Sequence, residues 1–240
     1  RSLLADSDLV NGEARVEWYF APEQRLSGAV FSKKIDNPIE SFVPPFSGLL
    51  TTSYANAPEA RLYGFELEGT KYVDLPFLPA DRRLVVVGNY TYTKSELKVG
   101  PDPPVAVFAS SSTRASDFFR DGSPLTGQSD HLVNLQVGLE SRERLSQQTL
   151  LLTYASERVF SRGLNGTPPQ PDIVEDPGFR LDFVMRAGFP LFGRAMEGKP
   201  EVRNIFGRGY EEFQRAGDAR IEINTYDVGT TIAGSISVTF

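Results

Sequence analysis

Apolar and polar residues alternate with a period of two along much of this 240-residue sequence, and no other feature limits its fold as strongly. The last thirteen residues show the pattern clearly, because small and mostly hydroxyl-bearing side chains alternate with apolar ones. The face opposite the hydroxyl groups carries Ile232, Gly234, Ile236, Val238 and Phe240. Such alternation predicts a strand that lies between two different environments. The segment ends on an aromatic residue, without the polar tail that a water-exposed terminus usually has.

The same alternation predicts eight further strands, whereas no segment has a convincing helical period. The nine predicted strands span approximately residues 13–20, 26–35, 61–72, 83–98, 131–140, 147–156, 179–189, 199–206 and 228–240. The first strand sets Glu13, Arg15 and Glu17 opposite apolar neighbours. The seventh does the same with Arg180 and Asp182. The second strand has two similar faces, so its orientation stays open.

The connectors between these strands alternate between short and long. The short ones fall near residues 21–25, 73–82, 141–145 and 190–198, and the long ones near 37–59, 99–130, 157–177 and 207–227. Outer-membrane barrels have tight turns at one end and long loops at the other, whereas loops above about 15 residues are uncommon in compact soluble domains. The sequence therefore predicts an all-β protein, an antiparallel transmembrane β-barrel. A soluble secreted β-sandwich or adhesin is the alternative, because its strands also alternate.

Composition narrows the function further. The formal net charge is −6 and the sequence pI is about 5.0, with no basic stretch of the kind that nucleic-acid binding requires. No apolar run approaches the roughly 18 residues of a membrane-spanning helix. The sequence begins at Arg1 without a leader segment, so we expect a mature or truncated piece. We therefore predict no nucleic-acid partner, and membrane crossing by strands alone.

No cluster of residues indicates catalysis, a cofactor or a metal ion. His131 is the only histidine, and the sequence has no cysteine. Glu66 and Glu68 share a strand face, but an acid–base pair would need a cleft and a raised pKa. We interpret these two residues as charged side chains that face the water-filled interior of a barrel. The prediction is a protein that is not an enzyme, without catalytic, cofactor-binding or metal-binding residues.

Five ordered segments carry the most specific pattern in the sequence. They are residues 56–69 (NAPEARLYGFELEG), 88–96 (GNYTYTKSE), 124–134 (PLTGQSDHLVN), 203–210 (RNIFGRGY) and 225–240 (TYDVGTTIAGSISVTF). Their order and spacing, rather than any one segment, resemble the C-terminal part of the β-barrel of a TonB-dependent outer-membrane receptor. The resemblance covers nearly the whole chain.

The resemblance implies that residues 1–240 form the last nine of about 22 barrel strands within a longer protein. The family's N-terminal plug and TonB-contacting box are not recognisable in this sequence. A place in the bacterial outer membrane of a Gram-negative cell is implied, with membrane lipid, the TonB complex (through the N-terminal region) and the barrel-assembly machinery as partners. In this family the final strand carries the assembly signal. Its positions here would be Gly234, Ile236, Val238 and Phe240.

The function that the resemblance implies is uptake of a scarce nutrient with energy supplied through TonB. The nutrient would be a small molecule such as siderophore-bound iron, cobalamin or a carbohydrate. A passive porin-like barrel is the alternative within the same fold. Aromatic residues on the long loops are candidate ligand contacts, although they could equally pack the loops against one another. They are Phe42, Phe46, Tyr54, Phe108, Phe118, Phe119 and Tyr210.

Overall fold

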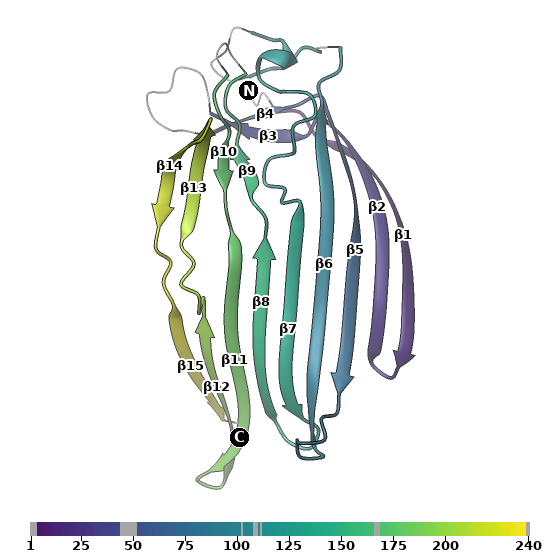
Figure 1. Cartoon of the computed structure of the whole chain (residues 1–240), viewed down its shortest axis with the longest axis vertical. Coiled ribbons are helices and arrows are strands. Elements are labelled where there is room, and N and C mark those ends of the chain that lie inside the picture. Colours follow the sequence, from purple (N-terminus) through teal and green to yellow (C-terminus); the bar gives the residue numbers. More distant parts are fainter. Residues whose placement is uncertain are drawn as a thin grey trace.

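Nine long antiparallel strands form one curved sheet in the computed structural model, which describes residues 4–43, 52–101, 103–107, 110, 112–165 and 169–238 (Figure 1). The sheet order is β1-β2-β5-β6-β7-β8-β11-β12-β15, so the long strands are neighbours in the order of the chain. Their bounds are β1 Asp8–Ala21, β2 Gln24–Asp36, β5 Glu59–Val73, β6 Arg82–Lys98, β7 His131–Ser141, β8 Ser146–Ala155, β11 Gly178–Leu191, β12 Arg194–Arg203 and β15 Thr231–Val238. All nine predicted strands are confirmed.

The strand register separates the sheet into one polar and one apolar face. A row across seven strands carries Glu17, Ser27, Glu68, Asn89, Asn134, Thr153 and Arg180. The neighbouring row, on the opposite face, carries Trp18, Leu26, Gly69, Gly88, Leu135, Leu152 and Leu181. We call these the polar face and the apolar face. The pairing of Leu26 with Trp18 settles the orientation of β2, which its own sequence leaves open.

All the short connectors lie at one end of the sheet and all the long ones at the other, as Figure 1 shows. The prediction of a turn over residues 190–198 is wrong, because the turn consists only of Phe192 and Gly193. Both residues have positive φ, 51° and 73°, and two-residue turns of this kind match the twist of paired strands. Pro190 pairs with Ala195 inside the hairpin and therefore does not end the strand.

The described residues of the long connectors form six short strands that the sequence pattern did not predict. They are β3 Ile39–Phe42, β4 Ser53–Asn56, β9 Arg158–Ser161, β10 Ile173–Glu175, β13 Tyr210–Ala216 and β14 Ala219–Tyr226. Strands β14, β13, β10 and β9 form a four-stranded sheet, and β3 pairs with β4. Within the described parts of the chain there is one 3₁₀ turn, η1, which spans Ala115–Asp117. None of the described residues belongs to a helix long and apolar enough to cross a membrane.

Candidate ligand site at the loop end

Three long connectors fold together over the end of the sheet. We call the described parts of residues 37–58, 99–130 and 156–177 the loop cap. A buried apolar cluster fills it and reaches down to the ends of β5 and β6. Its members are Phe42, Ala55, Ala57, Ala60, Leu62, Leu97, Val99, Val107, Ala115, Phe118, Phe119 and Leu125. These connectors thus have a core of their own.

A buried ion pair links two of these connectors. The side chains of Glu40 on β3 and Arg162, just after β9, are 0% and 3% exposed. The Arg162 Nε donates a hydrogen bond to Glu40 Oε2 at 2.6 Å, and its Nη2 donates to the Pro124 carbonyl of the third connector. The Glu40 carboxylate also accepts from the Thr126 amide at 3.3 Å. Burial raises the pKa of the Glu40 carboxyl, whereas Arg162 acts in the opposite direction.

Backbone hydrogen bonds run alongside this ion pair. The Val43 amide donates to the Arg162 carbonyl at 2.9 Å, and the Arg162 amide donates to the Ser41 carbonyl at 3.0 Å. The Gly127 amide donates to the Val159 carbonyl at 2.8 Å. Three connectors that are far apart in sequence are therefore fixed to one another by both side chains and main chain.

Two adjoining hollows are lined by residues of the loop cap. The larger, of about 490 Å³, lies between the polar face at its loop end, through Leu9, Ile35 and Leu62, and residues 38–40 and 125–128. The smaller, of about 230 Å³, is lined by Ser41, Thr52, Tyr54 and Phe160. Both are lined by Ile39, Thr126 and Gly127. Ligand sites are commonly concave, apolar and fitted with a few polar groups, which describes this pair of hollows.

The predicted ligand-contact aromatics divide into two groups. Phe42, Phe118 and Phe119 are buried in the loop-cap core, so here they pack the connectors together. Tyr54 is 57% exposed and lines the smaller hollow. Tyr210 lies outside the cap, where its ring stacks on Tyr226 with centroids 5.0 Å apart.

The remaining predicted contacts, Phe46 and Phe108, lie outside the described residues. So does Phe240 of the predicted assembly signal, which stays a prediction. Sequence reasoning missed the exposed Ile39 and Phe160 of the hollows. Phe160 could have been included with the other loop aromatics, because it also falls in a long connector.

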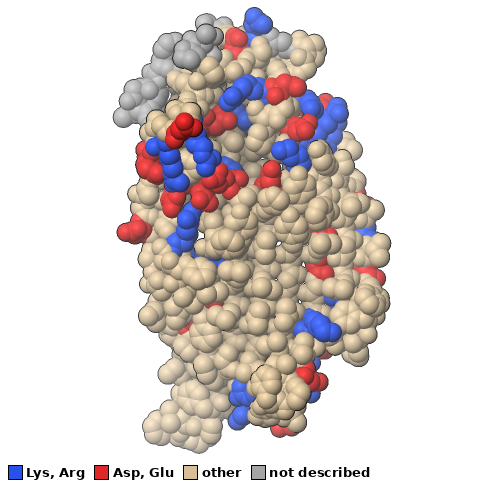
Figure 2. All heavy atoms as spheres, in the orientation of Figure 1, with Lys and Arg blue, Asp and Glu red and all other residues tan. Residues whose placement is uncertain are grey.

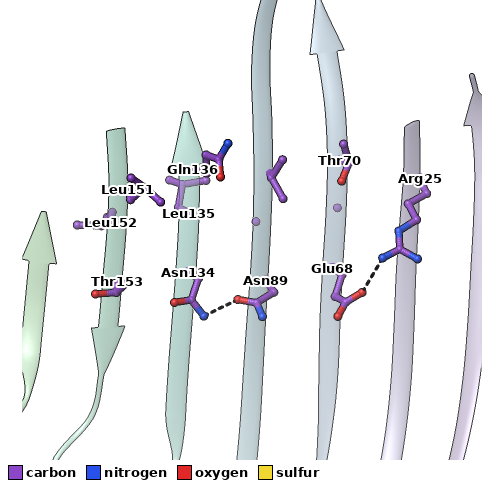
Figure 3. Close-up of a pocket in the computed structure, with 13 residues that line it drawn as sticks. Arg25, Glu68, Thr70, Asn89, Asn134, Leu135, Gln136, Leu151, Leu152 and Thr153 are labelled. Carbon is purple, nitrogen blue, oxygen red and sulfur yellow. Dashed lines mark hydrogen bonds and ion pairs between the residues drawn. The ribbon is translucent and has the colours of Figure 1, made fainter. Parts of the chain in front are cut away.

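Charged and amide side chains are connected along the polar face. Arg15 contacts Glu66 and Glu68 at 3.3 and 3.5 Å, and Arg25 bridges Glu68 and Glu17. On the next two strands of the same row, the side-chain amide of Asn134 donates to Asn89 Oδ1 at 2.8 Å (Figure 3). A hollow of about 400 Å³ lies along these strands. Both signs of charge are paired here, as expected of a wall that faces water.

Large apolar side chains on the opposite face have no protein covering. Val16 on β1 is 76% exposed and Ile232 on β15 is 79% exposed. On β6 the outward side chains are apolar or aromatic up to Tyr92 and charged from Lys94 onwards. The next two outward positions are Glu96 and Lys98. Figure 2 shows the result: an almost uncharged band, with most charged side chains gathered near the loop end. A β-sandwich would bury such a face, so the sandwich alternative does not fit.

His131 belongs to an aromatic cluster at the edge of this band. Its Nδ1 lies 2.8 Å from the Tyr90 hydroxyl, and the two rings are stacked with an interplanar angle of 9°. The Tyr92 ring lies 5.2 Å from the His131 ring. Interfacial aromatic rings are typical of barrel strands where the membrane meets water.

Comparison with known proteins agrees with this architecture. No curated protein matches the sequence. A family model described as "TonB dependent receptor-like, beta-barrel" matches residues 10–190, which include the long strands from β2 to β8 and nearly all of β1 and β11. Strands β12 and β15 follow the matched region and continue the same antiparallel sheet. The chain belongs to the TonB-dependent receptor-like β-barrel family.

Proposed function

We propose that this chain is the C-terminal barrel portion of an outer-membrane receptor that imports a scarce small-molecule nutrient with energy from the TonB complex. The family match supports the receptor class. The division into an exposed apolar face and a polar face supports a membrane barrel with a wet interior. The single observation that carries the ligand-binding part is the pair of hollows lined by the packed loop cap.

The receptor binds its nutrient at the mouth of the barrel, next to Ile39, Tyr54 and Phe160. These side chains are exposed although they lie beside a well-packed core. A ligand that covers them gains from apolar burial without having to order the connectors first, because these are already fixed by the Glu40–Arg162 ion pair. Siderophore-bound iron, cobalamin and carbohydrates are the candidate nutrients.

The nine strands complete a larger barrel together with other strands of the same receptor. Both β1 and β15 have one free edge in the described sheet. A free edge in a membrane leaves backbone groups without hydrogen-bond partners, at several kcal/mol each. In the complete receptor the polar face surrounds a plug that contacts TonB. The barrel-assembly machinery inserts the complete barrel into the outer membrane.

Uptake measurements test this function. Cells that carry the receptor should accumulate the labelled nutrient, and cells without TonB should not. Tyr54→Ala and Phe160→Ala should each raise the nutrient's Kd, whereas Phe77→Ala serves as the matched control. Phe77 is 78% exposed in a short turn at the other end of the sheet. Uptake that does not saturate and persists without TonB would indicate a passive porin-like barrel instead.

A further inference from the structure

A groove crosses the apolar face near the short-turn end. Two glycines, Gly69 on β5 and Gly88 on β6, are direct neighbours in the same cross-strand row. Leu26 and Leu135 flank them in that row. Because neither glycine carries a side chain, the apolar face is hollowed between the two leucines.

Large apolar side chains build the wall of this groove. Its volume is about 430 Å³, and its lining includes Trp18, Phe20 and Val86 in addition to the glycine floor. The Trp18 and Phe20 rings lie 5.3 Å apart and stand on the neighbouring edge of the sheet. A groove of this shape and lining fits a hydrocarbon chain.

A single cation stands at the end of the groove. Lys71 follows Gly69 by two residues on β5 and therefore faces the same side, towards the short turn after Val73. Its Nζ lies 5.2 Å from the centre of the Phe20 ring. Among the described residues no carboxylate forms an ion pair with it, in contrast to Arg15 and Arg25 on the polar face. Its ammonium group is exposed and available to an anion.

We propose that the groove is a binding site for one glycerophospholipid, with an acyl chain along Gly69 and Gly88 and the phosphate against Lys71. The inference rests on the outer-membrane location proposed above, in which the short turns lie on the periplasmic side. A phospholipid combines the two groups that this site would bind, an apolar chain in the groove and an anionic head group against Lys71. Lysine near the end of a spanning segment reaches the head-group layer in this way.

Native mass spectrometry of the receptor, purified from membranes in mild detergent, tests the site. The wild-type receptor should retain one phospholipid. Lys71→Gln should retain about tenfold less, the effect of losing one hydrogen bond to a charged group, and Lys71→Arg should restore binding. Gly88→Leu should fill the groove and remove the lipid. An added Cβ at Gly88 meets its nearest neighbour, Leu135 Cδ1, at 3.6 Å, so the strand tolerates it.

Ala14→Leu is the matched control, because it also places a leucine side chain on the apolar face, on β1 and four residues away from Trp18. It should retain the wild-type amount of lipid. Heat-modifiable migration on gels shows that each variant is folded. Equal phospholipid retention by wild type, Lys71→Gln and Gly88→Leu would overturn the proposal, as would equal retention of a phosphate-free diacylglycerol. A receptor absent from the outer-membrane fraction would refute the location itself, and the lipid site with it.

Discussion

The Glu40–Arg162 ion pair is the residue-scale contact on which the loop cap depends most. Removing one partner of a buried ion pair leaves an uncompensated charge and costs about 3–5 kcal/mol. We expect Glu40→Ala and Arg162→Ala each to lower the free energy of local opening of the cap by an amount of this order. Hydrogen exchange of the receptor in micelles measures it, through the protection of amides in residues 37–43 and 156–165.

The double variant Glu40→Ala/Arg162→Ala separates pairing from simple loss of packing. We expect the double variant to lower the free energy of local opening by clearly less than the sum of the two single variants, because it leaves no unpaired buried charge. Lys98→Ala provides the control, since Lys98 forms a more exposed pair with Glu96 and such pairs contribute about 0–1 kcal/mol. Additive effects of the two substitutions would show that the ion pair does not couple the connectors.

Gly64 on β5 is the position where the barrel wall tolerates a side chain least. A Cβ there would lie 1.9 Å from the Tyr92 carbonyl oxygen of β6 and 2.7 Å from the Phe31 ring of β2. Since a backbone oxygen cannot move without shifting the strand, we expect Gly64→Ala to lower the Tm and the amount of assembled receptor. Gly28→Ala should have little effect, because its Cβ would meet only Leu67 Cδ2 at 3.7 Å. Equal melting temperatures for the two variants would contradict this reading.

At the scale of elements, an ion pair that depends on pH links the β13–β14 hairpin to the connector between β8 and β9. Arg215 on β13 donates two hydrogen bonds to Glu157, at 2.8 and 2.7 Å, and thereby lowers the pKa of the Glu157 carboxyl. A carboxyl with a lowered folded-state pKa contributes its stability above the unfolded pKa of about 4.3. That contribution is lost as the pH falls through the folded-state value.

We therefore expect the hairpin to loosen as the pH is lowered from 7 through the acid range. Protection factors of the amides in β13 and β14, corrected for the intrinsic pH dependence of exchange, report this loosening. The Glu157→Gln variant should lack this part of the acid response. The effect should be modest, because the Glu157 side chain is 40% exposed and solvent screens the pair. An identical pH profile for the variant would remove Glu157 as the cause.

The long strands could be predicted from sequence because most of them carry their own evidence, a period of two with polar side chains on one face and apolar ones on the other. The six short strands of the connectors could not, because their pairing is set by tertiary contacts. Strand β9, for example, pairs with β10 and also contacts β3, which lies more than a hundred residues earlier in the sequence. Four residues such as those of β3 or β9 are too few to establish a period.

The candidate site was predictable only in outline. A loop aromatic has the same sequence signature whether it contacts a ligand or packs a loop, and burial separates Phe119 from Tyr54 only once the fold is known. The pairing of Glu40 with Arg162 joins positions 122 residues apart. No local sequence pattern predicts such a pair, because the buried site in which the two charges meet is formed by three connectors together.

At the scale of the whole molecule, the two faces of the sheet determine where the protein can reside. The polar face pairs its charges across strands, from Arg15 on β1 to Arg186 and Glu197 on β11 and β12. The apolar face leaves its largest side chains uncovered. A sheet of this kind is stable when water lies on one side and hydrocarbon on the other, which is the environment of a barrel wall.

Single spin labels can map this division directly, because these 240 residues contain no cysteine of their own that would also be labelled. We expect labels at Val16, Leu67 and Leu150 on the apolar face to collide with oxygen, which concentrates in hydrocarbon. Labels at Asn134 on the polar face and at Lys98 beyond the aromatic boundary should instead collide with a water-soluble nickel complex. The outward side chains of β6 change from aromatic to charged between Tyr92 and Lys94, and this position should lie at the membrane surface. If the labels at positions 16, 67 and 150 met the nickel complex as readily as the label at 98, the apolar face would not be buried in lipid, and the membrane-barrel assignment of this sheet would fail.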